Sequence, residues 1–379
     1  MPTAPNAVAL RAASIRHMPT EGFVPRSYSL FLIAILAGGG WFFTKGPGKG
    51  NLGKILSTYS QPSGGQNQAP AGYAPPYQGL QAPTQIPAHY ASQAVPAPAP
   101  PTPMLGGPAI RIASFNIQIF GDSKASKPHI MWTLAAIIQN FHVVAIQEIR
   151  TQDDYFIDNF LRNYVNQNGR AYDKVVGPRL GRSNSKEQYA FIYDTAAIEV
   201  NPHVITINDP DDLLHREPLV AMFRVRGPPP QQAFTFVLVN IHTDPDETDT
   251  ELDALAQVYQ VVRRSSGGED DIIVLGDLNV DDQHLGRLGQ LDGIRPLVRG
   301  VYSNTRQTAL YDNIVIHQPS TAEFSGRGGV YNFEQIHKLT REQALQVSDH
   351  LPVWAEFSAY ESAAPGRVAT REIPTIRAQ

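Results

Sequence analysis

The stretch "QVSDHLPVWAEF", residues 346–357, places three polar residues directly before a predicted strand. Its second half, "LPVWAEF", mixes apolar and polar side chains as a strand does. Ser348, Asp349 and His350 precede that strand. An Asp beside a His caps a turn in many proteins. In an enzyme the same pair supplies a carboxylate that holds a metal and an imidazole that moves a proton. The remainder of the chain distinguishes these two interpretations.

Length, charge and cysteine content limit the classes to which the protein can belong. The chain has 379 residues, enough for one to three domains, and a formal net charge of -4. It therefore has no overall basic field of the kind that attracts nucleic acid, although metal ions and local patches can supply positive charge. The absence of cysteine excludes disulfides, cysteine nucleophiles and cysteine-ligated zinc.

The N-terminal part predicts a membrane anchor. Residues 1–27 are polar, and residues 28–44 contain the uncharged apolar run "SLFLIAILAGGGWFF". This run is shorter than the roughly 20 residues of an ideal spanning helix, and a buried or interfacial segment is the alternative. No clear cleavage site follows. We therefore expect an uncleaved signal anchor with an extracytoplasmic catalytic domain, with secretion as the alternative localisation.

Composition predicts a tether, one folded domain and a tail after this segment. Residues 45–108 are rich in Pro, Ala and Gln, and residues 60–108 contain no Asp, Glu, Lys or Arg. Such a segment cannot bury a core, so we expect a disordered linker. Residues 109–360 have the size and the apolar content of a single folded domain, and residues 361–379 form a polar, basic tail.

Hydrophobic periodicity predicts alternating strands and helices within 109–360. Helical patterns cover "KPHIMWTLAAIIQN" (127–140), "DDYFIDNFLRNYVNQNG" (153–169, ending at Gly169) and "TDTELDALAQVYQVVRRSSGG" (248–268, with a Thr248/Glu251 capping box). Strand patterns include "AIRIASFNI", "HVVAIQEI", "QYAFIYD", "LVAMFRVRG", "FTFVLVNIH", "DIIVLGDLNV", "YDNIVIH" and "LPVWAEF". We therefore expect an α/β fold in which two sheets pack face to face with helices outside.

Polar residues recur at the ends of these strands. The residues are Asn116, Glu148, His242, Asp277, Asn279, Asp312, Asp349 and His350. Each has an ordinary explanation when taken singly, as a turn former, a surface charge or a core histidine. Six strand ends with the same feature predict convergence on one rim, because clustering unpaired carboxylates is costly without a function.

The residue types indicate hydrolysis of a phosphate ester. Four acids and two amides suit a hard cation such as Mg²⁺ or Mn²⁺ rather than zinc. Two histidines suit proton transfer. No Ser, Thr or Cys is framed by a glycine elbow, so we expect water to be the nucleophile.

Eight motifs together resemble the endonuclease/exonuclease/phosphatase superfamily, and specifically its deoxyribonuclease I branch. They occur in the family's order as "SFNIQIFG", "IQEIR", "GRSNSKEQYAFIY", "REPLVAMF", "VNIH", "GDLNVD", "YDNIVI" and "SDHLPV". The resemblance covers essentially all of residues 109–357. It implies a four-layered α/β sandwich, DNase I-like, with one divalent-metal site at its rim.

The resemblance also implies roles for single residues. Glu148 corresponds to the main metal ligand, with Asn116 and Asp349 nearby, while Asp277 and Asn279 would position the water and the scissile phosphate. The remaining residues with an implied role are two His-carboxylate pairs, His350 with Asp312 and His242 with Glu187, and the phosphate-contacting arginines Arg150 and Arg216.

Three departures from the family pattern concern substrate and ions. Gln118 stands where an arginine contacts the DNA backbone, and Ser185 where a tyrosine enters the minor groove. The cysteine pair of the animal enzymes is replaced by "NDPDDLLHREP", residues 208–218. The aspartates of this loop predict either a structural Ca²⁺ site or an ordinary acidic turn; they are Asp209, Asp211 and Asp212.

Three functions remain open from the sequence. The first is a Mg²⁺-dependent, largely sequence-nonspecific DNA endonuclease. The second keeps the chemistry but acts on lipid headgroups, inositol phosphates or RNA, which a membrane anchor would suit. The third is an inactive binding module, which is disfavoured because every expected catalytic position is filled. No motif indicates a protein partner.

Overall fold

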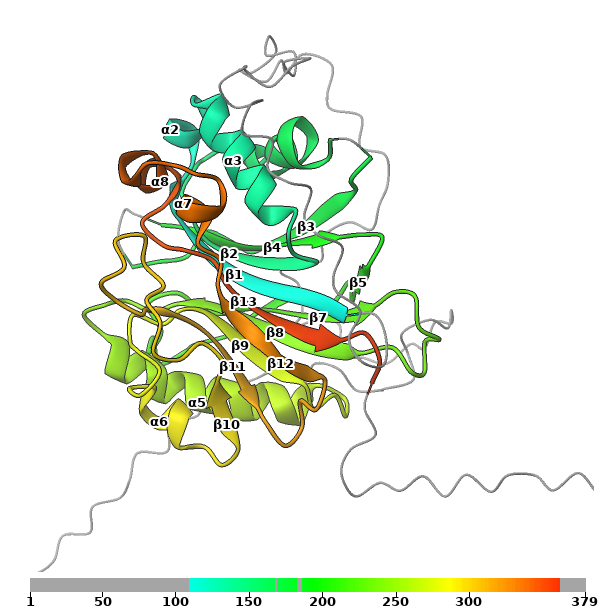
Figure 1. Cartoon of the computed structure of the whole chain (residues 1–379). Coiled ribbons are helices and arrows are strands. Elements are labelled where there is room, and N and C mark those ends of the chain that lie inside the picture. The colour runs from blue at the N-terminus through cyan, green and yellow to red at the C-terminus, as the bar shows by residue number, and fades with distance from the viewer. Residues whose placement is uncertain (1–108, 168, 183–185, 362–379) are drawn as a thin grey trace, which may run out of the picture.

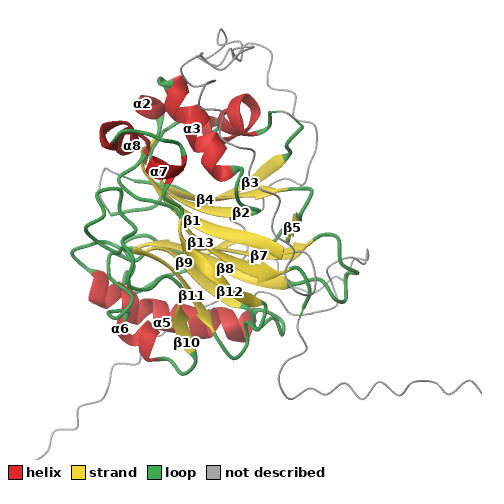
Figure 2. Cartoon of the chain, viewed as in Figure 1, coloured by secondary structure: helices red, strands yellow, loops and turns green. Residues whose placement is uncertain are grey.

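The structure is a computed structural model that describes residues 109–361, except residue 168 and residues 183–185. Two β-sheets lie face to face, and helices cover the outer face of each (Figure 1, Figure 2). The predicted α/β sandwich of two packed sheets between helices is therefore confirmed. The predicted polar N-terminal segment, linker and most of the tail lie outside the described residues.

The first sheet has six strands in the spatial order β12-β13-β1-β2-β4-β3. Its strands are β12 (Phe324–Val330), β13 (Val353–Ser358), β1 (Ala109–Phe120), β2 (Val143–Ile149), β4 (Gln188–Asp194) and β3 (Tyr172–Val176). β1 and β2 are parallel, whereas the other neighbours in this sheet are antiparallel.

The second sheet follows the order β10-β11-β9-β8-β7-β5, with β6 beside β7. Its strands are β10 (Ile294–Pro296), β11 (Asp312–His317), β9 (Ile272–Asp277), β8 (Thr235–His242), β7 (Leu219–Val225), β5 (Ile198–Val200) and β6 (Ile205–Thr206). β8 and β9 are parallel. Each sheet thus contains one parallel pair near its middle.

The helices divide between the two outer faces (Figure 1). On the first sheet lie α2 (Asp122–Ala125), α3 (Pro128–Ile138), α4 (Phe156–Phe160), α7 (Phe333–Ile336) and α8 (Arg341–Val347); on the second lie α5 (Thr248–Ser265) and α6 (Gly286–Gln290). The predicted helix over 153–169 is shorter than expected. α4 continues into one π-helical turn, Leu161–Val165, and ends before Gly169.

The predicted Thr248/Glu251 capping box is wrong. Glu247 is the residue that precedes the helix, and its side chain makes no cap hydrogen bond. The buried Glu251 carboxylate instead accepts hydrogen bonds from the backbone amides of His215 and Asp244. Glu251 therefore ties two loops to the start of α5 rather than capping its own helix.

The hydrophobic core has three layers because both sheets are buried on both faces. Ile112 of β1 faces the core between the sheets, together with Phe223 and Phe357. Phe115 of the same strand faces the helical layer beside α3, and Val239 of β8 faces α5. Strands buried on both faces carry nearly continuous apolar runs. This explains why the strand patterns are so apolar up to the polar residue at each end.

A buried polar network links the two sheets. Gln147 of β2 donates from Nε2 to Asn240 Oδ1 of β8 at 2.6 Å, and both side chains are fully buried. Asn240 Nδ2 donates to the carbonyl oxygens of Ile146 and Ala190 at 3.2 and 3.1 Å. The network therefore fixes the position of β8 relative to β2. Gln147 directly precedes Glu148, and Asn240 lies two residues before His242, so the network also fixes these two residues relative to each other.

The prediction of a membrane-anchored or secreted protein is corrected here. Within 109–361, apart from the four undescribed positions, no helix has the length and apolar character needed to cross a membrane. Residues 28–44, which carry the predicted anchor, lie outside the described residues.

We expect Asn240→Ala to destabilise the domain by about 2–4 kcal/mol, because Gln147 Nε2 loses one of its two acceptors and two buried carbonyl oxygens lose a donor. Urea unfolding of the full chain measures the change. Asn159→Ala is the control, since Asn159 is half-buried and accepts a hydrogen bond from Arg162 at the helix surface. Equal unfolding midpoints for the two variants would contradict the structural role of the network.

Candidate active site

The parallel strand pairs bring the predicted residues to one edge of the sandwich. His242 ends β8, Asp277 ends β9 and Asp312 begins β11. Strand register places His242 opposite Asp277, and Asp277 opposite Asp312. Three chemically active side chains therefore stand in one row across the second sheet. Carboxyl ends of parallel strands are the usual location of ligand sites in α/β sheets.

Irregular backbone on the first sheet turns Glu148 toward this row. Register shifts interrupt the ladders of β1 with β2 and of β2 with β4 close to Glu148. Glu148 has a φ of 62 degrees, in the left-handed region that side chains other than glycine rarely adopt. Its Oε2 accepts a hydrogen bond from the backbone amide of Ile119 at 2.9 Å, and Ile119 also has a positive φ, of 47 degrees. Strained backbone of this kind clusters at functional sites.

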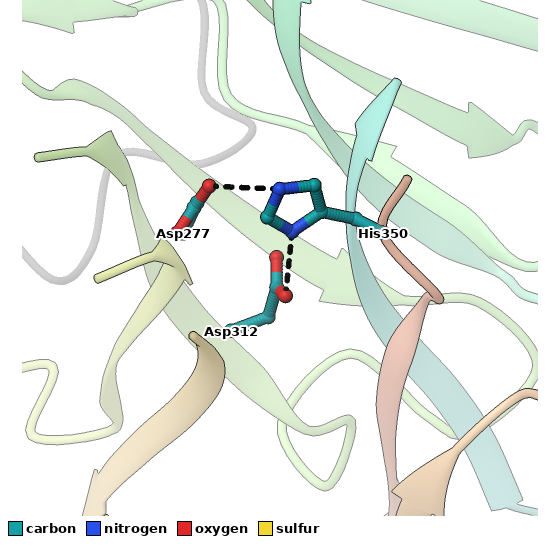
Figure 3. A group of neighbouring side chains, drawn as sticks. All are labelled: Asp277, Asp312 and His350. Atoms are coloured by element: carbon teal, nitrogen blue, oxygen red, sulfur yellow. Dashed lines mark hydrogen bonds and ion pairs between the residues drawn. The ribbon is translucent and has the colours of Figure 1, made fainter. Parts of the chain in front are cut away.

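Two His-carboxylate pairs face each other in the site. His242 Nδ1 lies 2.8 Å from Glu187 Oε1, and His350 Nδ1 lies 2.9 Å from Asp312 Oδ2. The opposite ring nitrogens of both histidines approach a single atom, Asp277 Oδ2, at 3.6 and 3.5 Å. Figure 3 shows one half of this arrangement, with the His350 ring between Asp312 and Asp277. Both predicted pairings are present in the structure.

Charge around the imidazoles changes their proton affinity. Burial lowers the pKa of His350, but the charges of Asp312 and Asp277 outweigh burial and hold that pKa well above its ordinary value. Burial likewise lowers the pKa of His242, and the hydrogen bond and charge of Glu187 raise it overall. Burial raises the pKa of Asp277, whereas His350 and His242 lower it, and the lowering prevails. These carboxylates thus raise the proton affinity of both imidazoles.

The predicted metal ligands adjoin this group. Asn116 Nδ2 donates to Asp277 Oδ2 at 2.9 Å and to Glu148 Oε1 at 3.2 Å, so Asn116 links Glu148 to the row of His242 and Asp277. Two buried oxygen atoms in this region, Asn116 Oδ1 and Asp349 Oδ1, have no hydrogen-bond partner among the described residues. Carboxylate and amide oxygens without a donor are suited to a hard divalent cation. The donor set therefore fits such an ion.

Three acidic or imidazole groups also come within reach of one ion. Ligand atoms of Asp277, Asp312 and His350 all lie within 4.8 Å of one another.

Asp277 Oδ1 accepts a hydrogen bond from the backbone amide of Asn279 at 3.1 Å, and Asn279 Nδ2 donates to Thr243 O at 2.8 Å. Asn279 therefore positions the turn behind Asp277.

The two predicted phosphate-contacting arginines differ in exposure. Arg216 is 6% exposed, with Nε 3.3 Å from Glu187 Oε1 and Nη1 donating to His242 O at 3.1 Å. Arg150 is more accessible, and its Nη2 lies 3.3 Å from both Glu148 Oε2 and Glu187 Oε2. Arg216 thus holds the Glu187–His242 pair from behind, while Arg150 bridges that pair to Glu148.

The predicted departures have structural consequences. Gln118 Nε2 donates to Asp349 Oδ2 at 2.8 Å, so this amide contacts a predicted metal ligand. Ser185 lies outside the described residues. In the acidic loop, Asp209 Oδ2 accepts a hydrogen bond from Leu214 N at 2.6 Å, and Asp212 pairs with Arg182 at 3.0 Å. These contacts favour the acidic-turn interpretation of this loop over the Ca²⁺ site.

Sequence reasoning missed several residues that support the site. Ser303 Oγ donates to Asp312 Oδ2 at 2.6 Å, and the Tyr311 ring lies 6.1 Å from the His350 ring. Tyr189 Oη accepts a hydrogen bond from His242 N at 2.9 Å. Lys124 is buried beside α8, and burial lowers its pKa to about 8 although Asp349 and Glu148 oppose the shift. Tyr311 immediately precedes Asp312 in the sequence; nothing in the sequence marks the other three.

Comparison with known proteins identifies the family. Residues 113–350 match the family model described as the Endonuclease/Exonuclease/phosphatase family. Deoxyribonuclease-1-like 1 of Sus scrofa is 34% identical over 269 residues, which are 67% of this chain and 82% of that protein. Deoxyribonuclease gamma of Homo sapiens is 31% identical over 274 residues, which are 68% of this chain and 88% of that protein.

A solved structure also aligns with the domain. It is a functionally unknown conserved protein from Enterococcus faecalis V583, with a TM-score of 0.48 at 13% identity, covering 66% of this chain and 100% of that one. On the family match and the two deoxyribonuclease relatives, the chain belongs to the endonuclease/exonuclease/phosphatase family, in its deoxyribonuclease I-like branch.

Proposed function

We propose that this protein is a divalent-metal-dependent nuclease that hydrolyses the phosphodiester backbone of DNA with little sequence preference. The observation that carries the proposal is the convergence of His242 and His350 on Asp277 Oδ2, at 3.6 and 3.5 Å. Two imidazoles on either side of one position can accept a proton from water and donate a proton to a leaving oxygen. The deoxyribonuclease names of the relatives support DNA as the substrate.

His242 and His350 share the proton transfers in this proposal. One imidazole takes the proton of the attacking water, and the other protonates the leaving oxygen. Glu187 and Asp312 hold the Nδ1 atoms, which directs Nε2 of each ring toward Asp277, beside which we place the substrate. Hydrogen bonds of this kind fix the tautomer and the orientation of an imidazole. Asp277 and Asn279 orient the water and the scissile phosphate.

Glu148, Asn116 and Asp349 would hold the metal ion, which we propose to be Mg²⁺ or Mn²⁺. A bound divalent cation polarises the phosphate and neutralises the charge that develops on it. Glu148 is oriented for this role by the Ile119 amide and by Asn116. Asp349 keeps one buried oxygen without a hydrogen-bond partner in the described residues.

Arg150 is the arginine that we propose for direct contact with a phosphate. Both arginines pair with Glu187, but the side chain of Arg150 is 25% exposed whereas that of Arg216 is 8% exposed. A guanidinium suits phosphate because two of its N–H groups can donate in parallel. Arg216 then contributes charge and position to the Glu187–His242 pair.

Gln118 favours a second candidate, a phosphodiesterase or phosphatase that acts on RNA, lipid headgroups or inositol phosphates. An amide at this position provides no positive charge for a duplex backbone, and its Nε2 is already bonded to Asp349. DNA remains the first proposal because both deoxyribonuclease relatives match over about two thirds of the chain.

Incubation of the full chain with supercoiled plasmid tests the function. We expect nicking with Mg²⁺ or Mn²⁺ and none with EDTA. His350→Ala or His242→Ala should slow nicking by roughly 10²–10⁴-fold, which is the usual contribution of general acid–base catalysis. His284→Ala is the matched control, because His284 is exposed and pairs with Asp281 elsewhere on the surface.

Three outcomes of this assay are informative. Metal-dependent nicking that is lost with His350 or His242, but kept in the His284 variant, supports the nuclease. Near-normal nicking by both site variants would refute the assigned roles. Absence of nicking by a folded protein that binds metal would reject duplex DNA as the substrate, and single-stranded DNA, RNA and phospholipid or inositol phosphate esters are the next substrates to assay.

NMR titration of the histidines tests the electrostatics of the site. We expect His350 and His242 to titrate above 6.5, while burial lowers the pKa of His337 to about 4. Asp312→Asn should lower the pKa of His350, and Glu187→Gln that of His242. A folded pKa above the unfolded value means that each pair stabilises the fold fully below pH 6.5 and loses this contribution as pH rises through the folded pKa. Titration of both below 6.5 would contradict the proposed pairing.

Gln118→Arg tests the substrate side of the site. A new positive charge at a duplex backbone should strengthen binding of double-stranded DNA and increase the slope of log K against log salt by about one. Gln118→Met, similar in length and uncharged, is the control. If the introduced guanidinium only paired with Asp349, the salt slope would stay constant and the metal requirement would rise, which would argue against a backbone contact at this position.

A further inference from the structure

A second group of acidic side chains lies at the opposite end of β9 from the active site. Asp271 directly precedes β9, Glu323 directly precedes β12, and Glu361 follows β13. One carboxylate oxygen from each lies within 4.8 Å of the others. β9 separates Asp271 from Asp277 by six residues, or about 20 Å of extended strand. This group is therefore distinct from the catalytic one.

Neighbouring backbone holds the group in place. Thr235 N donates to Glu361 Oε2 at 3.1 Å, and Asp271 N donates to Glu269 Oε1 at 2.9 Å. The Asp271 carbonyl accepts a hydrogen bond from Val237 N, and the Glu323 carbonyl accepts one from Ser358 N. The ends of four strands from both sheets thus converge on these carboxylates.

Two buried oxygen atoms at this site, Asp271 Oδ1 and Thr321 Oγ1, make no hydrogen bond of regular geometry within the described residues. Asp271 is 1% exposed, and its Oδ1 has no hydrogen-bond partner among the described residues. Thr321 is 2% exposed and lies close enough to Asp271 to affect its pKa, yet within the described part of the chain Thr321 Oγ1 also has no partner in hydrogen-bond geometry. A buried oxygen without a donor is costly, and a bound cation would satisfy both atoms.

The charges that act most strongly on Asp271 have the same sign as its own. Burial, and after it the charges of Glu323 and Glu269, raise the pKa of Asp271 to about 10. Burial also raises the pKa of Glu361 to about 8, with Glu269 and Glu323 contributing. Burial of several carboxylates together is unfavourable unless a proton or a cation compensates their charge.

We propose that Asp271, Glu323 and Glu361 bind a hard divalent cation, calcium or magnesium, at the pole of the sandwich opposite the active site. The ligands are oxygen atoms only, and they come from three separate segments, so one ion replaces repulsion between them with attraction to a common centre. Thr321 Oγ1 is a further neutral oxygen beside Asp271. The ion would fasten the end of β13 in the first sheet to the start of β9 in the second.

Thermal unfolding of the full chain with added Ca²⁺ or Mg²⁺ tests this site. Every protein carries Glu148→Gln, which removes a proposed ligand of the catalytic ion, so the readout is independent of nuclease activity. We expect the unfolding midpoint of the Glu148→Gln protein to rise by about 5–10 °C when the bound cation, Ca²⁺ or Mg²⁺, is at one hundred times its Kd. Isothermal titration calorimetry should show binding with a stoichiometry of one.

Variants of the ligands identify the site. Asp271→Asn should abolish the rise and the calorimetric signal, and Glu361→Gln should weaken both; Glu361→Gln decides the question if the Asp271 variant fails to fold. Glu342→Gln is the matched control, because Glu342 is an exposed carboxylate on α8. With EDTA at pH 8, Asp271→Asn should unfold at about the same temperature as its parent, since a carboxyl with a pKa of about 10 carries a proton at this pH and the substitution removes no charge.

Two results would overturn the proposal. One is the absence of any midpoint change up to about 10 mM of either cation, above the weakest affinities usual for calcium modules. Stability that depends on pH without responding to cations would then mean that the carboxylates share protons. The other is an unchanged response in Asp271→Asn and Glu361→Gln, which would move the cation to another part of the chain.

Discussion

The buried carboxylate of Asp277 is the group on which the geometry of the active site depends. It is 1% exposed and lies between two imidazoles, with Asn116 and the Asn279 amide donating to its two oxygens. An unpaired buried carboxylate is strongly unfavourable, so these neighbours stabilise the fold at the point where we propose that catalysis takes place. The same hydrogen bonds and charges around Asp277 therefore serve both the stability of the fold and the proposed function.

A glycine makes this arrangement sterically feasible. Gly276, directly before Asp277, has a φ of 155 degrees, and a Cβ at this position would lie 1.8 Å from the Ile241 carbonyl oxygen. β8 and β9 can therefore approach closely just where His242 must stand beside Asp277. Behind them, the Gln147–Asn240 contact sets the position of β8 relative to β2. The distance between the two halves of the site is thus determined by packing that contains no catalytic residue.

The sequence predicts what depends on local pattern. Apolar strands followed by a polar residue indicated the sandwich and placed Glu148, His242 and Asp277 at strand ends, because both signals lie within a few consecutive residues. It could not predict contacts that depend on distant segments. Ser303 reaches Asp312 through a turn, and Glu251 matches a capping pattern but serves two other loops. The membrane interpretation rested on composition alone, without any long-range contact to test it.

The two ends of β9 show how neighbouring charges determine the pKa of a buried carboxylate. Asp277 and Asp271 are equally buried, at 1% exposed, and lie at the two ends of the same short strand. Imidazoles around Asp277 outweigh burial and lower its pKa, whereas burial and further carboxylates raise that of Asp271 to about 10. At one end the protein itself supplies the positive charge. At the other end the charges that act most strongly on Asp271 are those of Glu323 and Glu269, and a proton or the cation that we propose would compensate them.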